Sequence, residues 1–494
     1  MELPSGLMNM KPLLTCHEKI TMKTIETENV GADAERIAIP AQKVSLTRVT
    51  LLGLSGQQLG PSAAIAAGSI PLYAGYGSWL AMALALLAAL CMTAAVNVFA
   101  RKYVVTGSLL SYVGIALGRL PQRVVAASYL VGFLVVCAAL SACFVTFSSS
   151  LLHSLGVDFA LAGWFQAVTA IVISLLAGIL TWRGLDASIS VTAWLSFLPV
   201  PLLALVAIVA AMNTGVDLNA QLTLDGVTLT SLAEGTIVAL AYFVGCDALA
   251  ALAAETDAPK KNVPLLLRNV LLITGLSFIA ILILSAPLMA EHLTALANGE
   301  SPTQILAAAA GLEYLQMPID FLLGAATFAS LVAFMNYGSR VFATAAVDRF
   351  IPQVFSRIHP KFGSPTGSTV LMGVAAAFIP VALQVLTETP PLQSTAYLST
   401  LYSLFWIAPY VLLGLGAIKE IIRDGRMEPV KITVISIGVF VFVALLVYNF
   451  VADPGGVFGA LPYVMVGLTV AAFITFSVVD MRNKNKSYRY VADE

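Results

Sequence analysis

The sequence predicts an all-α integral membrane protein with twelve transmembrane helices, and three observations support this fold class. Of the 494 residues, 59% are hydrophobic and only 11% are charged, and the mean hydropathy is +0.90. A soluble core of this length cannot bury so much apolar surface, so a large share must face lipid. The apolar residues also fall into membrane-length segments, and Lys and Arg gather between alternate pairs of these segments.

Each predicted span follows from one rule. A helix crosses the hydrocarbon with about 20 apolar residues, because every backbone polar group must be paired within the segment. The predicted spans are, in order, Arg48–Tyr73, Gly77–Ala100, Val124–Leu152, Trp164–Trp182, Ala187–Met212, Leu232–Ala253, Leu265–Ala290, Phe321–Ala345, Thr369–Leu386, Tyr397–Ile418, Ile432–Val451 and Val457–Val479. An even number of spans places both ends of the chain on the same side of the membrane.

The distribution of basic residues tests this count and gives an orientation. With the N-terminus inside, all 26 Lys and Arg fall on the inner side or at inner helix ends. The outer loops carry acids and His, among them Asp217, Asp225, Glu291, His292 and Glu300. Because cytoplasmic loops are enriched in Lys and Arg, we expect a multi-pass protein of the cell (plasma or inner) membrane with both termini cytoplasmic. The first 47 residues have no apolar h-region and are expected to be a cytoplasmic tail, not a signal peptide.

The first span contains a candidate helix break at Ser55-Gly56-Gln57-Gln58-Leu59-Gly60-Pro61-Ser62. Pro61 has no N–H, and Gly56 and Gly60 permit unusual backbone angles. Unwinding here is expected to leave the carbonyls of Gln57, Gln58 and Leu59 unpaired. It would also free the N–H groups of Ser62 and Ala63 at the start of a half-helix, where a carboxylate can bind. The alternative is a proline kink repaired by neighbouring helices.

The sixth span contains a second candidate break, at Ala241-Tyr242-Phe243-Val244-Gly245-Cys246-Asp247. Asp247 is the one acid well inside a predicted span, and an intramembrane carboxylate is by default a functional candidate. The alternative is an acid that caps a helix end.

Breaks in spans one and six, five spans apart, are the pattern of a five-plus-five inverted repeat. The predicted organisation is therefore residues 1–47 as the N-terminal tail, 48–213 and 232–418 as the two five-helix repeats, 430–480 as two extra C-terminal helices, and 481–494 as a cytoplasmic tail.

These residues resemble the amino acid–polyamine–organocation (APC) superfamily. The sixth span and its exit, through Glu255 to Pro264, look like that family's sixth helix and the Lys/Pro-rich loop after it. Ser339-Arg340 through Asp348-Arg349-Phe350-Ile351-Pro352 to Ser364-Pro365 looks like the eighth helix and its exit, and the first span resembles the family's glycine-rich first helix. One departure is that Gly60-Pro61-Ser62 replaces the usual Gly-x-Gly. The resemblance covers roughly Arg48 to Val479.

The resemblance implies a secondary transporter of an amino acid or related organic amine, working by alternating access around a site between helices one, three, six, eight and ten. The substrate-binding residues it implies are Gln58, Gly60, Pro61, Ser62 and Ala63 on helix one, Cys137 with Gly132 and Phe133 on helix three, Ala241, Tyr242, Phe243 and Val244 on helix six, and Phe334 on helix eight. The apolar members Gly132, Phe133, Cys137 and Phe334 favour a neutral or hydrophobic substrate side chain, although ordinary helix packing is the better explanation for each of them. Asp247 favours a cationic substrate or a proton.

Coupling to protons through Asp247, or exchange of one substrate for another, is expected in preference to sodium. The predicted fifth span holds no Lys that could mimic a bound sodium, and the hydroxyls of Thr327 and Ser330 on the eighth span are separated. The five Cys form no C-x-x-C pattern, so neither a metal nor another cofactor is expected. The net charge of −1 argues against a nucleic-acid partner, so the expected partners are a small-molecule substrate, the lipid bilayer and protons.

Three other functions are weighed against transport of an organic solute. An inorganic-cation (potassium-type) permease of the same fold would need more oxygens converging on Asp247 than Tyr242, Ser62 and Gln58 offer. A non-transporting receptor or sensor would need a soluble output domain, for which the predicted tails are too short. An enzyme is not expected, because the acyltransferase-like spacing of His153 and Asp158 lies in a predicted outer loop and arises easily by chance.

Overall fold

The computed structural model describes residues 43–184, 192–297, 301–387, 389, 391–425, 428–451, 456–482 and 491–492. These residues belong to one compact unit, Glu35–Glu494. Residues 1–42 of the predicted N-terminal tail, the start of the predicted fifth span (187–191), and residues 483–490 and 493–494 of the predicted C-terminal tail lie outside the described part of the chain.

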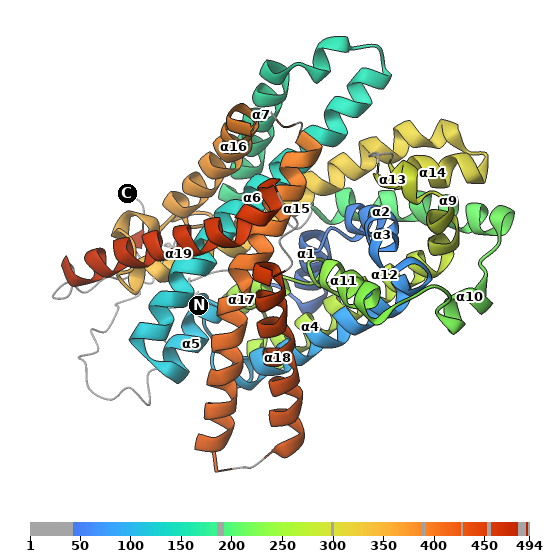
Figure 1. Cartoon of the computed structure of the whole chain (residues 1–494). Coiled ribbons are helices and arrows are strands. Elements are labelled where there is room, and N and C mark those ends of the chain that lie inside the picture. Colours follow the sequence, from blue (N-terminus) through green and yellow to red (C-terminus); the bar gives the residue numbers. More distant parts are fainter. Residues whose placement is uncertain are drawn as a thin grey trace, which may run out of the picture. The chain divides into compact units, whose positions relative to one another are not determined.

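Helices make up nearly all of the described chain (Figure 1). The first half contains α1 (Leu46–Gly56), α2 (Leu59–Ser69), α3 (Pro71–Ala74), η1 (Gly75–Gly77), α4 (Ser78–Ala100), α5 (Leu109–Leu117), α6 (Arg119–Ser154), η2 (Asp158–Leu161), α7 (Gly163–Trp182), α9 (Pro199–Thr214) and α10 (Leu218–Thr223). The second half contains α11 (Leu229–Leu240), η3 (Cys246–Glu255), α12 (Pro259–Glu291), α13 (Leu293–Ala297), α14 (Pro302–Ala310), η4 (Glu313–Leu315), α15 (Gln316–Val347), η5 (Gln353–Ser356), α16 (Thr366–Thr387), α17 (Pro391–Arg423), α18 (Pro429–Val451) and α19 (Gly456–Arg482). Two two-residue strands, β1 (Arg357–Ile358) and β2 (Val491–Ala492), pair in parallel.

Ten helical runs among the described residues are long and apolar enough to cross a membrane. They confirm the predicted multi-pass, all-helical membrane fold, because their apolar side chains need lipid around them. The count of twelve spans and the inverted-repeat arrangement stay predictions. One of the ten, Leu46–Ala100, is 55 residues long, and the predicted sixth span is represented by the shorter α11 and the 3₁₀ helix η3.

The long helix α6 packs against α15, α16, α17 and α19, so it lies within the helix bundle. Aromatic rings fill its contact with α17: the ring centroids of Tyr129 and Phe133 lie 5.1 and 5.3 Å from that of Trp406, edge to face. This approach requires glycine at position 132, where a Cβ atom would come within 2.7 Å of the Trp406 ring. Gly132 is thus required for helix packing, and its role in substrate binding stays a prediction.

Hydroxyl groups on α15 hold α1 by its backbone. Tyr337 donates to the carbonyl of Leu52 at 2.7 Å, and Ser330 donates to the carbonyl of Ser55 at 2.6 Å. Gly56 allows Tyr337 to approach, since a Cβ there would come within 2.6 Å of the phenol oxygen. These bonds add side-chain donors near the end of α1, where the Ser55 carbonyl also accepts from the N–H of Gln58 at 3.1 Å.

A buried ion pair joins the end of η3 to α15. The Arg340 guanidinium is 1% exposed, and it donates through both Nε and Nη2 to the carboxylate of Glu255, the second bond being 2.7 Å long. Its Nη1 donates to the carbonyl of Asn336 at 2.7 Å. A bidentate pair with this additional bond satisfies both charges where water is excluded.

The segment before α1 forms hydrogen bonds with the same C-terminal end of η3. The N–H of Val44 donates to the carbonyl of Glu255 at 2.7 Å, and the N–H of Asp257 donates to the carbonyl of Val44 at 3.0 Å. Lys43 donates to the carbonyl of Ala254. Together with the ion pair, these bonds fasten the C-terminal end of η3 to both α15 and the chain entering α1.

Two further charge clusters join helix ends. Asp480 at the end of α19 accepts from Arg119 at 2.7 Å and from Arg123 at 2.6 Å, both on α6. Lys102, after α4, donates to Glu420 and Asp424 at the end of α17. Burial by itself lowers the pKa of Lys102, but its hydrogen bonds to Asp424 and Glu420 outweigh burial and raise that pKa above its ordinary value.

We predict that Arg340→Met destabilises the protein by about 3–5 kcal/mol, because it leaves the Glu255 carboxylate buried without a partner. Thermal unfolding of the purified variant, followed by the fraction remaining monodisperse after heating, measures the effect. Adding Glu255→Gln should recover much of the loss, since no buried charge then remains. The control is Arg423→Met, whose guanidinium is 66% exposed and 4.0 Å from Glu420, and which should leave the unfolding temperature almost unchanged. Equal losses in the two single variants would contradict the role of the buried pair.

Candidate functional site

The predicted break in the first span is present, between α1 and α2. The α-helix stops at Gly56, and Gln58 adopts left-handed backbone angles (φ 52°, ψ 51°) before α2 begins at Leu59. Left-handed angles are uncommon for a residue other than glycine, and they turn the chain out of the first helix. Gly60 and Pro61 lie in the first turn of α2, where the missing N–H of proline costs no hydrogen bond.

The prediction of which main-chain N–H and C=O groups lack a partner at this break was wrong. The N–H of Ser62 donates to the carbonyl of Gln58 at 2.8 Å, and the Ser62 hydroxyl donates to the carbonyl of Gln57 at 3.2 Å. Ala63 is also inside α2, one turn after Leu59. The reason is that the left-handed residue lies before Leu59, so the Gln58 carbonyl becomes the first acceptor of the new helix. The N–H groups that precede the first intrahelical acceptor are therefore those of Leu59 and Gly60.

The second predicted break is also present. Helix α11 ends at Leu240, residues 241–245 form turns, and Gly245 has a φ of 90°. The chain then continues as a 3₁₀ helix over the ten residues of η3. Runs of 3₁₀ helix longer than three or four residues are uncommon, and a long one often marks a hinge or a strained segment.

Asp247 lies in the first turn of η3, and it is 4% exposed. Its carboxylate accepts three hydrogen bonds: from the Tyr129 hydroxyl at 2.5 Å, from the Tyr410 hydroxyl at 2.6 Å and from the Trp406 indole N–H at 3.1 Å. Tyr129 belongs to α6, and the other two donors belong to α17. A carboxylate can be held in the membrane at tolerable cost only with such partners.

Two more bonds hold the same turn. The Ser108 hydroxyl donates to the Asp247 carbonyl at 2.8 Å, and the N–H of Gly245 donates to the Tyr410 oxygen at 3.2 Å. The start of η3 is therefore attached to α6, to α17 and to the segment before α5.

Other predicted site residues connect the two breaks and the helices around them. Tyr242 hydrogen-bonds Ser69 at the end of α2, with 2.7 Å between the hydroxyl oxygens. The carbonyl of Ala241 accepts from the Tyr402 hydroxyl of α17 at 3.5 Å. Phe334 of α15 lies against the turn at Gly245, where a Cβ would come within 3.1 Å of its ring. Cys137 is completely buried on α6, and its role as a substrate contact stays a prediction.

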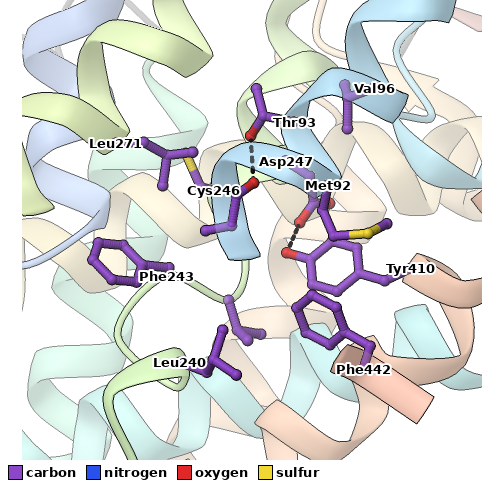
Figure 2. Close-up of a pocket in the computed structure, with 12 residues that line it drawn as sticks. Met92, Thr93, Val96, Leu240, Phe243, Cys246, Asp247, Leu271, Tyr410 and Phe442 are labelled. Atoms are coloured by element: carbon purple, nitrogen blue, oxygen red, sulfur yellow. Dashed lines mark hydrogen bonds between the residues drawn. The ribbon is translucent and has the colours of Figure 1, made fainter. Parts of the chain in front are cut away.

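A small cavity of about 10 Å³ lies behind the second break (Figure 2). It is lined by residues of α4, α11, the turn after it, η3, α12, α17 and α18: Ala89, Met92, Thr93, Val96, Leu240, Phe243, Val244, Cys246, Asp247, Leu271, Tyr410 and Phe442. Of the predicted site residues, only Phe243, Val244 and Asp247 line it. The cavity therefore shares Phe243 and Val244 with the position predicted for the substrate, and Asp247 belongs to its wall.

The hydroxyls considered for sodium are used within the protein. Ser330 donates to the Ser55 carbonyl, as described above, and Thr327 donates to the carbonyl of Leu323 at 2.9 Å. Within the described residues no group of three or more His, Cys, Asp or Glu side chains is placed to hold a metal ion.

Sequence reasoning found Asp247 but missed its donors. Tyr129 stands in an apolar run of the third span, and Trp406 and Tyr410 stand one helical turn apart in the tenth. The four-residue spacing was the available signal, because it puts two N–H or O–H donors on one helix face. Glu255 and Arg340 were both noted as parts of resembling segments, but their pairing depends on two helices that are distant in the sequence.

Comparison with known proteins identifies the family. The sequence profile described as amino acid permease matches residues 46–473, which include both broken spans. The chain belongs to the amino acid permease family. The expected membership of the APC superfamily is thereby confirmed.

Relatives of this permease are transporters of several substrates. It is 24% identical over 345 residues to the branched-chain amino acid permease BcaP of Bacillus subtilis, covering 67% of this chain and 72% of that protein. It is 23% identical over 371 residues to the methylthioribose transporter of the same organism, covering 72% and 78% of the two chains. It is 22% identical over 408 residues to the chloroplastic cationic amino acid transporter 7 of Arabidopsis thaliana, covering 77% and 66%.

We predict that Gly245→Ala impairs the permease, because a side chain there must adopt a left-handed backbone and meet the Phe334 ring. The backbone term alone costs about 1–2 kcal/mol. Thermal stability of the purified protein and uptake into proteoliposomes measure the effect. The matched control is Gly178→Ala in α7, where an added Cβ meets nothing within 4 Å. Unchanged stability and uptake in Gly245→Ala would contradict the strained turn described for the second break.

Proposed function

We propose that this permease is a secondary active transporter of an amino acid or a related organic amine, and that it works by alternating access across the cell membrane. The observation that carries the proposal is the pair of helix breaks, one between α1 and α2 and one between α11 and η3. Broken helices expose main-chain N–H and C=O groups in the membrane, and these groups can bind the carboxylate and amine shared by all amino acids. Family membership and the names of the relatives support the same substrate class.

The helical runs are compatible with the twelve proposed spans. Leu46–Ala100 has 55 residues, which at 1.5 Å per residue is well over twice the roughly 30 Å of the hydrocarbon core. We therefore count it as two spans. Adding the broken sixth span, made of α11 and η3, to the other runs gives twelve. The cytoplasmic placement of both termini continues to rest on the distribution of Lys and Arg.

For the substrate site, we propose the N-terminal end of α2 and the turn after α11. The N–H groups of Leu59 and Gly60 would receive the substrate carboxylate, beside Ser62 and Ala63. The carbonyls of Ala241 and Tyr242, in the turn after α11, would receive the amine, and Phe334 would cover the substrate side chain. The fully buried Cys137 and the apolar character of Phe334 favour a neutral or hydrophobic substrate.

We propose that Asp247 acts in gating and coupling and does not bind the substrate directly. Its carboxylate already accepts three hydrogen bonds, which hold the start of η3 against α6 and α17. Protonation would turn one oxygen into a donor, so fewer of the three rings could keep their bonds. A proton taken up by Asp247 would thus loosen η3, and this would connect proton movement to the opening of the site. Exchange of one substrate for another remains the alternative mode, because it needs no net proton movement.

A screen for stabilising ligands tests the proposed substrate class. The purified permease is heated with single amino acids, biogenic amines and alkali cations. A ligand present at 100 times its dissociation constant stabilises the folded state by about 2.7 kcal/mol, which gives a clear shift in the unfolding temperature. We expect at least one amino acid or amine to give such a shift. A shift with potassium alone would contradict the proposal and favour an inorganic-cation permease.

We predict that Asp247→Asn abolishes accumulation of substrate driven by a pH gradient but keeps substrate exchange. An amide cannot take up the proton, while its shape and one acceptor oxygen are retained. Proteoliposomes with an acidic exterior measure accumulation, and preloaded proteoliposomes at equal pH measure exchange. The control is Asp320→Asn, which neutralises the half-buried acid in the first turns of α15. Full accumulation by Asp247→Asn, or loss confined to Asp320→Asn, would refute the coupling role of Asp247.

A further inference from the structure

The cavity behind the second helix break has polar groups on one side only. Asp247, Tyr410 and Thr93 supply carboxylate and hydroxyl oxygens, and the rest of the lining is mainly apolar, from residues such as Met92 and Phe442. Figure 2 shows the Asp247 carboxylate bonded to Tyr410 at the cavity wall. The other two donors to Asp247, Tyr129 and Trp406, do not line the cavity.

The main chain adds another acceptor. The N–H groups of Cys246 and Ala248 donate to the carbonyls of Phe243 and Gly245. For the intervening carbonyl, that of Val244, the described part of the chain supplies no hydrogen-bond donor. Val244 lines the cavity and is 6% exposed. An acceptor buried in this way needs a partner, and an ordered water is a common one.

The Asp247 carboxylate also has acceptor capacity left. Among the side-chain donors, Tyr410 and Trp406 bond to its Oδ1, whereas Tyr129 bonds to its Oδ2. A carboxylate offers about four lone-pair sites. About one site therefore remains, and it belongs to a residue of the cavity wall.

We propose that this cavity is a site for a single water molecule, and that this water exchanges the proton of Asp247 on the side of η3 that faces α4 and α18. The volume of about 10 Å³ is close to the smallest that holds one water. The Val244 carbonyl and the Asp247 carboxylate would accept its two hydrogens, which gives the water the minimum of two partners that a buried water requires. The Thr93 hydroxyl donates to the Ala89 carbonyl at 3.0 Å, so its oxygen can accept from the water when Asp247 is protonated and itself donates to the water.

The same geometry disfavours a metal cation. Hard cations take roughly six or more oxygen ligands, whereas this wall offers one carboxylate, two hydroxyls and one carbonyl beside an otherwise apolar lining. A water needs no charge compensation, and it can either donate to the ionised carboxylate or accept from the protonated one. The site thus fits both protonation states of Asp247.

In the proposed proton transfer, one O–H bond breaks and one forms at each step. When Asp247 gives up its proton, the carboxyl O–H bond breaks and the proton passes to the oxygen of the water, leaving a carboxylate that regains the hydrogen bonds of Tyr129, Tyr410 and Trp406. The extra proton passes from the water to the solvent once movement of η3 opens the cavity, and uptake is the reverse.

This inference rests on the proposed proton coupling, and a cavity-filling variant tests the two separately. Ala89→Leu introduces three additional carbon atoms from the wall on α4, and Thr93→Val removes the hydroxyl at nearly constant volume. In proteoliposomes with an acidic exterior, we expect Ala89→Leu to slow pH-driven accumulation at least tenfold, and Thr93→Val severalfold. Substrate exchange at equal pH, which needs no net proton movement, should stay within twofold of wild type in both variants.

The matched control is Ala94→Leu, on the same helix, half-buried and outside the cavity lining. It should leave accumulation and exchange unchanged. If Ala89→Leu does not fold, the Thr93→Val measurement decides. If substrate accumulation by the wild type does not depend on the pH gradient, both the proposed proton coupling and this inference are overturned. A coupled wild type with full accumulation in both Ala89→Leu and Thr93→Val would overturn the water site alone.

A second measurement identifies the occupant. A map of the wild-type protein at a resolution that shows ordered water should contain one density within hydrogen-bonding distance of both Asp247 and the Val244 carbonyl. Anomalous scattering from rubidium or thallium at that position would overturn the assignment to water.

Discussion

Three hydrogen bonds to one buried carboxylate determine where the central helices of this permease lie. A carboxylate inside the membrane must be paired or neutralised, and Asp247 is paired by Tyr129, Tyr410 and Trp406. Because these donors come from α6 and α17, the bonds fix the second half of the broken sixth span against both helices. The ring packing of Tyr129 and Trp406, and the absence of a side chain at Gly132, follow from the same close approach.

The opposite end of η3 is held by a different kind of bond. Glu255 and Arg340 form a buried, bidentate ion pair, and Val44 pairs with Glu255 through the main chain. The 3₁₀ helix η3 is thus fastened at both ends, by neutral donors at Asp247 and by a charged pair at Glu255. Between α11 and η3 the turn at Gly245 supplies the backbone freedom for the two halves to move differently. We therefore expect η3, which Asp247 holds, to respond to protonation, whereas α11 does not.

The sequence allowed the membrane fold, the family and both helix breaks to be predicted, because each depends on local composition. Long apolar runs demand helices in lipid, and Pro61 and Gly245 limit where a helix can continue. The break in the first span lies where it was expected, but the new half-helix begins at Leu59 and not at Ser62, since the left-handed conformation of Gln58 has no signature in residue type. The three donors to Asp247 and the pairing of Glu255 with Arg340 could not be derived, because they join residues 85 to 163 positions apart in the chain.

Hydrogen–deuterium exchange at the start of η3 tests whether the Asp247 carboxylate holds this helix against α6. The exchange of the main-chain amides from Gly245 to Ala250 is compared in the wild type and Asp247→Asn, with Ala254 and Glu255, at the end held by Arg340, as the internal reference. We expect slow exchange over residues 245–250 in the wild type and faster exchange in Asp247→Asn, with little change at the reference. Identical exchange in the two proteins would contradict this role of Asp247.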